Sequence, residues 1–294
     1  LADLKPRTVW EITDDAFDLY REHFVLLGGV SAVIFAPALL LLSTAGVEAF
    51  GNFLDATGSR TATRDAAIGF AWLYPLLAAA YVTHFGATAL AVRDYLTGET
   101  PTIISVYKRT FRHFFPLLVI ALMVGLLAFI STCTYIGPLL VGAYYSFSAH
   151  GIVLEDRRIV DSVKRSRQIA GAYFGKSFGL LCLMGFIALA LTGGAIAVVA
   201  LGFTFVPKDI TATPPNGGRS ISDYIQLLTA GLMAVLIAPL PAIATTLLYY
   251  DLRVRREGLD IESEAQAWDV ALAPDPFQGV LNPKIPKPKK GGKK

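Results

Sequence analysis

Long apolar runs without a single charged side chain are the feature that most constrains how this chain can fold. Six runs can be marked, and each reaches or exceeds the about 20 residues that an α-helix needs to cross the hydrocarbon core of a bilayer. Within lipid the backbone must satisfy its own hydrogen bonds, which a helix does inside one segment. The expected membrane spans are residues 24–47, 66–92, 114–133, 135–154, 177–206 and 224–250.

A turn signal rather than charge separates the third and fourth spans. Residues 114–154 form one uncharged stretch that is too long for a single crossing. Its middle holds the small polar residues Ser131–Thr134, followed by Gly137 and Pro138. Such clusters are typical of turns, so we expect a tight connection there.

The distribution of lysine and arginine predicts the orientation. Of the 26 Lys and Arg residues, 22 lie before the first span, in the loops after the second and fourth spans, or in the C-terminal tail. The other three loops share the remaining four. Because basic residues accumulate in cytoplasmic loops, we expect both termini in the cytoplasm.

The polar segments before the first, third and fifth spans resemble one another. Residues 8–24, 102–114 and 159–174 each show apolar side chains at helical spacing and enter a span at an aromatic residue. Amphipathic helices of this kind lie in the membrane interface. The alternative is that any cytoplasmic loop entering a membrane looks amphipathic. The second, fourth and sixth spans also end alike, at Asp94, Asp156 and Asp251.

These patterns predict an all-α membrane protein with six transmembrane helices as three hairpins, each preceded by a cytoplasmic interfacial amphipathic helix. Residues 1–258 make up this membrane domain. Residues 259–294 form a cytoplasmic tail, whose acidic first part predicts a short helix and whose proline- and lysine-rich end predicts disorder. The tail lysines favour anionic lipid as a partner. Nucleic acid is not favoured, because aromatic residues are absent beyond Phe277.

Three segments resemble bacterial proteins related to the glycerophosphoryl diester phosphodiesterase membrane domain. They are residues 10–24, 163–167 and 246–260, within a similarity that spans roughly residues 8–262. The resemblance implies a six-helix bundle in the bacterial cytoplasmic (inner) membrane. Some family members carry a soluble phosphodiesterase, but no soluble segment here can hold a barrel of about 250 residues. The phosphodiesterase activity is therefore not expected, and the resemblance implies fold and location without a reaction.

None of the six spans contains Asp, Glu, Lys or Arg. Ion-coupled transporters usually carry such a residue inside the membrane, although coupling through backbone carbonyls at broken helices stays open. The polar segments also contain no familiar catalytic motif. We therefore expect a non-enzymatic protein, a structural or accessory subunit or a helper of a membrane complex, with membrane lipids and membrane proteins as partners.

Prolines within the spans support an alternative function. A proline removes a backbone donor and bends a helix, and the freed carbonyl can line a cavity. A transporter or lipid-handling protein with a cavity between kinked helices is therefore the second hypothesis, and simple shaping of the helices is the competing explanation. The prolines concerned are Pro37, Pro75, Pro239 and Pro241.

Two histidines fall inside the expected spans. His84 and His150 are candidate ligands for haem or a pigment, because imidazole is a common axial ligand. A hydrogen bond to a neighbouring helix is the favoured interpretation, since no second ligand at matching depth is evident. No cofactor is therefore expected, and no CxxC or His/Cys cluster predicts a metal site.

Basic residues next to the spans are candidates for contact with anionic lipid headgroups, since they lie on the expected cytoplasmic side. They are Lys108, Arg109, Arg112, Lys164, Arg165, Arg167, Arg253, Arg255 and Arg256.

Overall fold

Every regular element in the described part of the chain is a helix. A computed structural model describes residues 7–41, 60–134, 136–206 and 221–257. The predicted tail, residues 259–294, lies outside the described residues, as does the end of the first predicted span.

The helices are α1 (Val9–Glu22), α2 (Phe24–Leu41), α4 (Arg60–Leu96), α5 (Ile103–Arg112), α6 (Phe114–Ser131), α7 (Gly137–Tyr145), α8 (Ser148–Val153), α9 (Ile159–Ala172), α10 (Phe174–Phe203), α12 (Ile221–Ile237) and α13 (Pro239–Glu257), with a 3₁₀ turn at Thr132–Thr134.

Three short helices each run into a longer apolar helix through a single non-helical residue. His23 separates α1 from α2, His113 separates α5 from α6, and Tyr173 separates α9 from α10. The first pair bends by 88°. Thr8 and Thr102 cap α1 and α5 by accepting a hydrogen bond from the backbone N–H three residues ahead, which satisfies a donor that the helix start leaves free. The predicted amphipathic segments are therefore helices.

Four helical segments of the described chain are long and apolar enough to cross a membrane. They become five if α1 and the start of α2 together count as one bent span. None of the most apolar window of α10 is buried within the protein, as suits a surface that faces lipid. The four segments are Pro75–Leu96, Phe114–Thr134, Phe174–Phe203 and Tyr224–Arg256.

The predicted span at residues 135–154 is interrupted rather than continuous. α7 ends at Tyr145 and α8 begins at Ser148. Ser166 of α9 reaches into this break: its hydroxyl donates to the Tyr144 carbonyl at 2.9 Å and accepts from the Phe147 N–H at 3.2 Å. A side chain inserted into the helical ladder is a recognised cause of such a kink.

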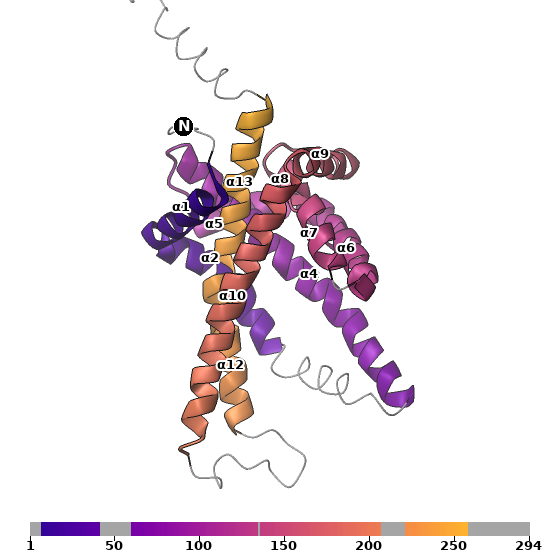
Figure 1. Ribbon diagram of the computed structural model, residues 1–294, viewed down its shortest axis with the longest axis vertical. Helices are drawn as coiled ribbons and strands as arrows, with labels where there is room; N and C mark the ends of the chain where they lie inside the picture. The colour runs from indigo at the N-terminus through magenta and orange to yellow at the C-terminus, as the bar shows by residue number, and fades with distance from the viewer. Residues whose placement is uncertain (1–6, 42–59, 135, 207–220, 258–294) are drawn as a thin grey trace, which may run out of the picture.

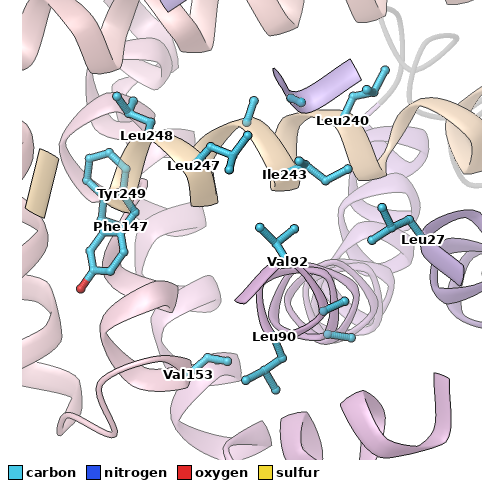
Figure 2. Packing of buried hydrophobic residues seen from close by; sticks show 14 of the residues in the cluster. Leu27, Leu90, Val92, Phe147, Val153, Leu240, Ile243, Leu247, Leu248 and Tyr249 are labelled. Carbon is cyan, nitrogen blue, oxygen red and sulfur yellow. The ribbon is translucent and has the colours of Figure 1, made fainter. Parts of the chain in front are cut away.

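The core is centred on the C-terminal half of α4, on α8 and on α13, and α1, α2, α5, α6, α9 and α10 add buried residues to it. Val92, Val153 and Tyr249, one from each of these helices, are buried (Figure 2). The short helices pack around them, α5 against α4, α9 against α8, and α1 against α13. Figure 1 shows α1 and α5 on one side of α13 and α9 on the other side. Each short helix therefore covers the end of the core helix that precedes it, and the first covers the last.

Burial repeats at the same positions in the three helix pairs. Seven residues before the single-residue break, Ala16, Val106 and Ser166 are fully buried. Seven residues after it, Val30, Ile120 and Leu180 are buried as well. A shared burial pattern at matching positions is the structural counterpart of the similarity seen in the three polar segments.

Candidate functional site

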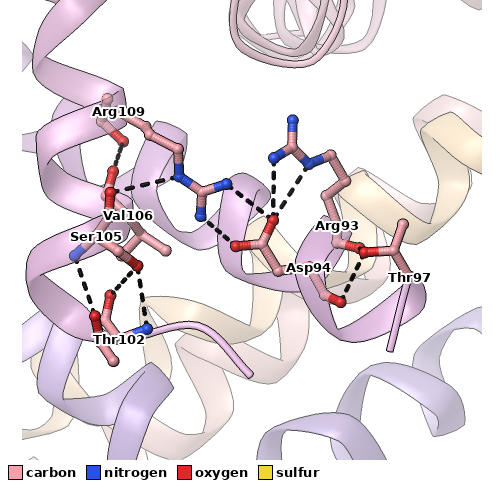
Figure 3. A network of polar contacts seen from close by, with 8 residues as sticks. Arg93, Asp94, Thr97, Thr102, Ser105, Val106 and Arg109 are labelled. Carbon is pink, nitrogen blue, oxygen red and sulfur yellow. Dashed lines mark hydrogen bonds and ion pairs between the residues drawn. The ribbon is translucent and has the colours of Figure 1, made fainter. Parts of the chain in front are cut away.

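A carboxylate with little exposure lies in or just after the C-terminal half of each of the three core helices. At the end of α4, Asp94 is only 2% exposed. Arg109 of α5 binds both carboxylate oxygens of Asp94: its Nη1 lies 3.1 Å from Oδ1, and its Nη2 contacts Oδ2 (Figure 3). The neighbouring Arg93 adds a second ion pair, with its Nη2 3.1 Å from Oδ1. The hydrogen bond to Asp94 raises the pKa of Arg109 above its ordinary value. Such a two-pronged pair fixes orientation as well as charge.

Glu155 takes the same place after α8. Arg165 of α9 lies 3.5 Å from its Oε1, and Arg253 of α13 lies 3.3 Å from the same atom. Arg157 and the Tyr249 hydroxyl donate hydrogen bonds to the carboxylate. Burial alone would raise the pKa of Glu155, but these hydrogen bonds and cations outweigh burial and lower it. The carboxylate therefore stays ionised and joins three helices.

Asp251 of α13 accepts hydrogen bonds from the segment just before α1 and from two cations. The Arg7 backbone N–H donates to its Oδ1 at 2.7 Å, and Lys176 and Arg255 approach its Oδ2 at 2.5 and 3.0 Å. The Arg7 carbonyl in turn accepts from both cations, with Arg255 at 2.9 Å. The short segment before α1 is thus fastened to the last described helix and to the start of α10.

The ion pairs divide the predicted headgroup contacts into two groups. Four of the nine basic residues bind carboxylates within the protein: Arg109, Arg165, Arg253 and Arg255. The sequence prediction did not foresee these ion pairs. The other five are exposed at the surface: Lys108, Arg112, Lys164, Arg167 and Arg256.

The sequence showed a recurring carboxylate but matched the wrong residue in the second unit. Asp156 is 89% exposed at its side chain and has a positive φ of 54°, while the neighbouring Glu155 faces the core. A better signal was available: Glu155 directly follows the apolar run that ends at Leu154, whereas Asp156 lies one residue further from it.

An apolar pocket of about 430 Å³ lies among α4, α6, α7, α8, α10 and α13. Phe85, Val124 and Leu181 form part of its wall. The hydroxyls of Ser146 and Thr245 also reach the wall, but both donate to carbonyls of their own helical segment, at 3.1 and 2.7 Å. Because those donors are already engaged, the surface that the pocket offers a ligand is mainly apolar.

One of the four predicted prolines lines this pocket. Pro241 contributes to its wall. Pro239 is buried at the first position of α13, directly after the break at Ala238 that ends α12. Pro37 and Pro75 are exposed within α2 and α4 and do not line it. The cavity is therefore next to the proline pair of α13 rather than between kinks on three helices.

Both candidate histidines are buried against neighbouring helices. His150 Nε2 lies 3.0 Å from the Thr246 hydroxyl of α13, and its ring stacks on Tyr249 at a centroid distance of 5.0 Å. His84 Nδ1 lies 3.4 Å from the Ser31 hydroxyl of α2. This is the geometry of interhelical hydrogen bonds, as the favoured interpretation expected. Within the described ranges, no group of three His, Cys, Asp or Glu side chains is placed to hold a metal.

Comparison of the chain with protein-family models, with curated proteins and with solved structures gave no match.

Proposed function

We propose that the protein is a non-enzymatic, multi-pass protein of the bacterial cytoplasmic membrane that holds a lipid chain between its helices. The proposed membrane domain has six transmembrane spans arranged as three hairpins, with both termini in the cytoplasm. Three packing contacts support this arrangement: α2 against α4, α6 against α7, and α10 against α12. The bias of basic residues supports the orientation.

The apolar pocket that Pro241 lines, called below the pocket behind Pro241, is the observation that supports the lipid-handling function. Its volume of about 430 Å³ falls in the range of ligand sites in proteins, roughly 300–1,000 Å³. Apart from the hydroxyl-bearing side chains Tyr81, Tyr145, Ser146 and Thr245, the wall is apolar, so the pocket suits an apolar chain better than a polar solute. An acyl chain gains about 0.8 kcal/mol for each methylene that leaves water, although in a membrane it merely exchanges one apolar environment for another. The pocket therefore holds an acyl chain by its shape, and any preference for one acyl chain over another must come from how well that chain fits.

Crosslinking with a diazirine-bearing phospholipid tests this function. The full chain in lipid nanodiscs is irradiated, and the adducts are mapped by peptide mass spectrometry. Adducts at pocket residues such as Tyr81, Val124 and Thr245 are expected. Adducts confined to the exposed face of α10 would contradict the proposal, because they report only the surrounding bilayer.

A pocket-filling variant provides the matched comparison. Ala149 lines the pocket, so Ala149→Phe places a ring inside it and should abolish the pocket adducts. Ala197 is exposed on α10, so Ala197→Phe adds the same ring outside the pocket and should leave the adducts unchanged. Equal labelling of both variants would overturn the assignment.

A role as an accessory subunit is the second candidate. The exposed face of α10 supports it, because Phe186, Leu189 and Val198 are all exposed on the side of this helix that the other described helices leave uncovered. Such a face suits either lipid or a partner helix. Purification in mild detergent should recover a stoichiometric membrane-protein partner, and Phe186→Ala with Leu189→Ala should release it. A chain that always purifies alone would exclude this role.

A further inference from the structure

A second pocket, also of about 430 Å³, lies between α1 and the junction of α12 with α13. Its floor is apolar and comes from three helices: Leu191 of α10, Met233 of α12 and Leu240 of α13. Its rim carries two opposite charges from α1, Asp18 and Arg21. It is separate from the pocket behind Pro241 and shares no lining residue with it.

The proline break shapes this pocket. Pro239 and Pro241 have no N–H to donate, so the helical ladder is interrupted near Ala238. Tyr20 of α1 lines the pocket, and its hydroxyl donates to the Leu236 carbonyl at 2.7 Å. This bond holds α1 over the junction, and it places the charged rim at a fixed position above the apolar floor.

The two rim charges are available to a ligand. Arg21 Nη2 lies 3.2 Å from Asp18 Oδ1, but the side chains are 86% and 71% exposed. A pair this exposed contributes about 0–1 kcal/mol, so it can exchange its internal contact for contacts with a ligand at little cost. The rim thus presents one cation and one anion side by side at the mouth of an apolar groove.

We propose that this pocket binds a phospholipid with a primary-amine headgroup, such as phosphatidylethanolamine. The lipid phosphate binds the Arg21 guanidinium, the ammonium donates hydrogen bonds to Asp18, and an acyl chain lies along Leu191 and Met233. An anionic lipid satisfies Arg21 but repels Asp18. Phosphatidylcholine carries the same charges, but its quaternary ammonium has no N–H to donate. The proposal does not depend on the pocket behind Pro241.

Native mass spectrometry of the full chain in detergent measures the preference directly. Phosphatidylethanolamine, phosphatidylglycerol and phosphatidylcholine with the same acyl chains are titrated separately. Phosphatidylethanolamine should bind about tenfold more tightly than either of the others, the effect of one charge-assisted hydrogen bond. Excess inorganic phosphate should not displace it. Displacement by phosphate would identify an anion site without a lipid, and equal binding of the three lipids would overturn the proposal.

Rim variants separate the two contacts. Arg21→Gln should weaken phosphatidylethanolamine binding about tenfold, and Asp18→Asn should remove the preference over phosphatidylglycerol. Arg158, an exposed arginine at the N-terminal end of α9 and outside the predicted headgroup contacts, provides the control, and Arg158→Gln should not change the preference. A loss shared by Arg158→Gln would show general surface electrostatics instead. Ala149→Phe should also leave this site unaffected, so a failure here is distinguishable from a failure of the proposed lipid-chain pocket.

Discussion

Glu155 lies just beyond α8, and cations from the loop that follows, from α9 and from α13 surround it. Its pKa is held below the ordinary value of 4.5. A carboxyl whose pKa falls on folding adds stability above its unfolded pKa, and this contribution is lost as the pH drops through the folded pKa. The contribution of Glu155 is therefore complete at neutral pH and disappears in acid below about pH 4.5.

Replacing this carboxylate should reveal the pH dependence. Glu155→Gln should lower the free energy of unfolding by about 1–3 kcal/mol at pH 7, because Arg165 and Arg253 lose a charged acceptor. The difference from the wild type should shrink as the pH falls below 4.5. Thermal unfolding in detergent between about pH 7 and pH 3 measures this. A difference that stays constant across the range would mean that Glu155 acts through packing alone.

Gly151 allows α9 to approach α8 closely. A Cβ at this position would collide with the Ser162 hydroxyl and would lie 3.2 Å from Ser162 Cβ and 3.4 Å from its Cα. Rotating the Ser162 side chain would move the hydroxyl away but would break its hydrogen bond to the Ser148 carbonyl, and it would not move the Ser162 Cβ, whose position the backbone fixes. Gly151→Ala should therefore destabilise the protein by about 1–3 kcal/mol.

Two comparisons make this expectation specific. Gly175 of α10 has nothing within 4 Å of an added Cβ, so Gly175→Ala should be neutral or slightly stabilising, since alanine favours a helix. Adding Ser162→Gly to Gly151→Ala should restore part of the lost thermal stability. If Gly151→Ala alone is as stable as the wild type, the close packing of α8 on α9 is refuted.

At the scale of elements, α5 carries cations with two different tasks. Arg109 is used inside the protein against Asp94, whereas Lys108 and Arg112 are exposed. Ile104 and Phe111 are exposed on the same helix, which gives α5 a mixed apolar and basic face of the kind that binds anionic membrane surfaces.

The two kinds of cation should give different variant phenotypes. Lys108→Gln with Arg112→Gln should weaken binding of phosphatidylglycerol vesicles to the purified protein by about 1 kcal/mol per charge, and thermal stability should not change. Arg109→Gln should lower the thermal stability, because it leaves Asp94 buried with one partner fewer. Vesicle flotation at increasing salt and thermal unfolding measure the two effects. Identical behaviour of the two variants would contradict this division.

The short helices were predictable, whereas the break between α7 and α8 was not. Apolar spacing and the aromatic residues at positions 24, 114 and 174 located α1, α5 and α9 and their ends to within a residue or two. The break depends on Ser166, which lies on a different helix and inserts its hydroxyl between Tyr144 and Phe147. No local pattern in residues 135–154 encodes a contact that forms only after α9 has docked.

The candidate sites depend on the whole molecule, and this explains why the sequence located them only in part. Pro241 was predicted beside a cavity and lines one. The remaining wall comes from five other helices, so its position follows from packing and not from any single segment. The partners of Asp94, Glu155 and Asp251 likewise depend on which short helix covers which core helix. The sequence showed the carboxylates and the cations, but not their pairing.

Loss of the Asp251 carboxylate should lower the stability of the protein more than loss of an exposed carboxylate. Asp251→Asn leaves the cations Lys176 and Arg255 close together without a full counter-charge. Removing one partner of a buried ion pair costs about 3–5 kcal/mol of stability. Because both cations are partly exposed, we expect a smaller loss of about 2–3 kcal/mol. Asp156→Asn, at an exposed carboxylate, is the control. Thermal unfolding should show a large loss for the first variant and none for the second.

The bond between Arg7 and Asp251 joins residues 244 positions apart. A ribosome adds about 5–20 residues each second, so α1 is made about 10–50 seconds before the helix that it finally covers. During that interval the face of α1 that packs on α13 lacks this partner, although α2 and α10, which α1 also contacts, are made earlier. An amphipathic helix in this state is suited to lie in the membrane interface. When α13, the last described helix, emerges, it completes the contact with α1.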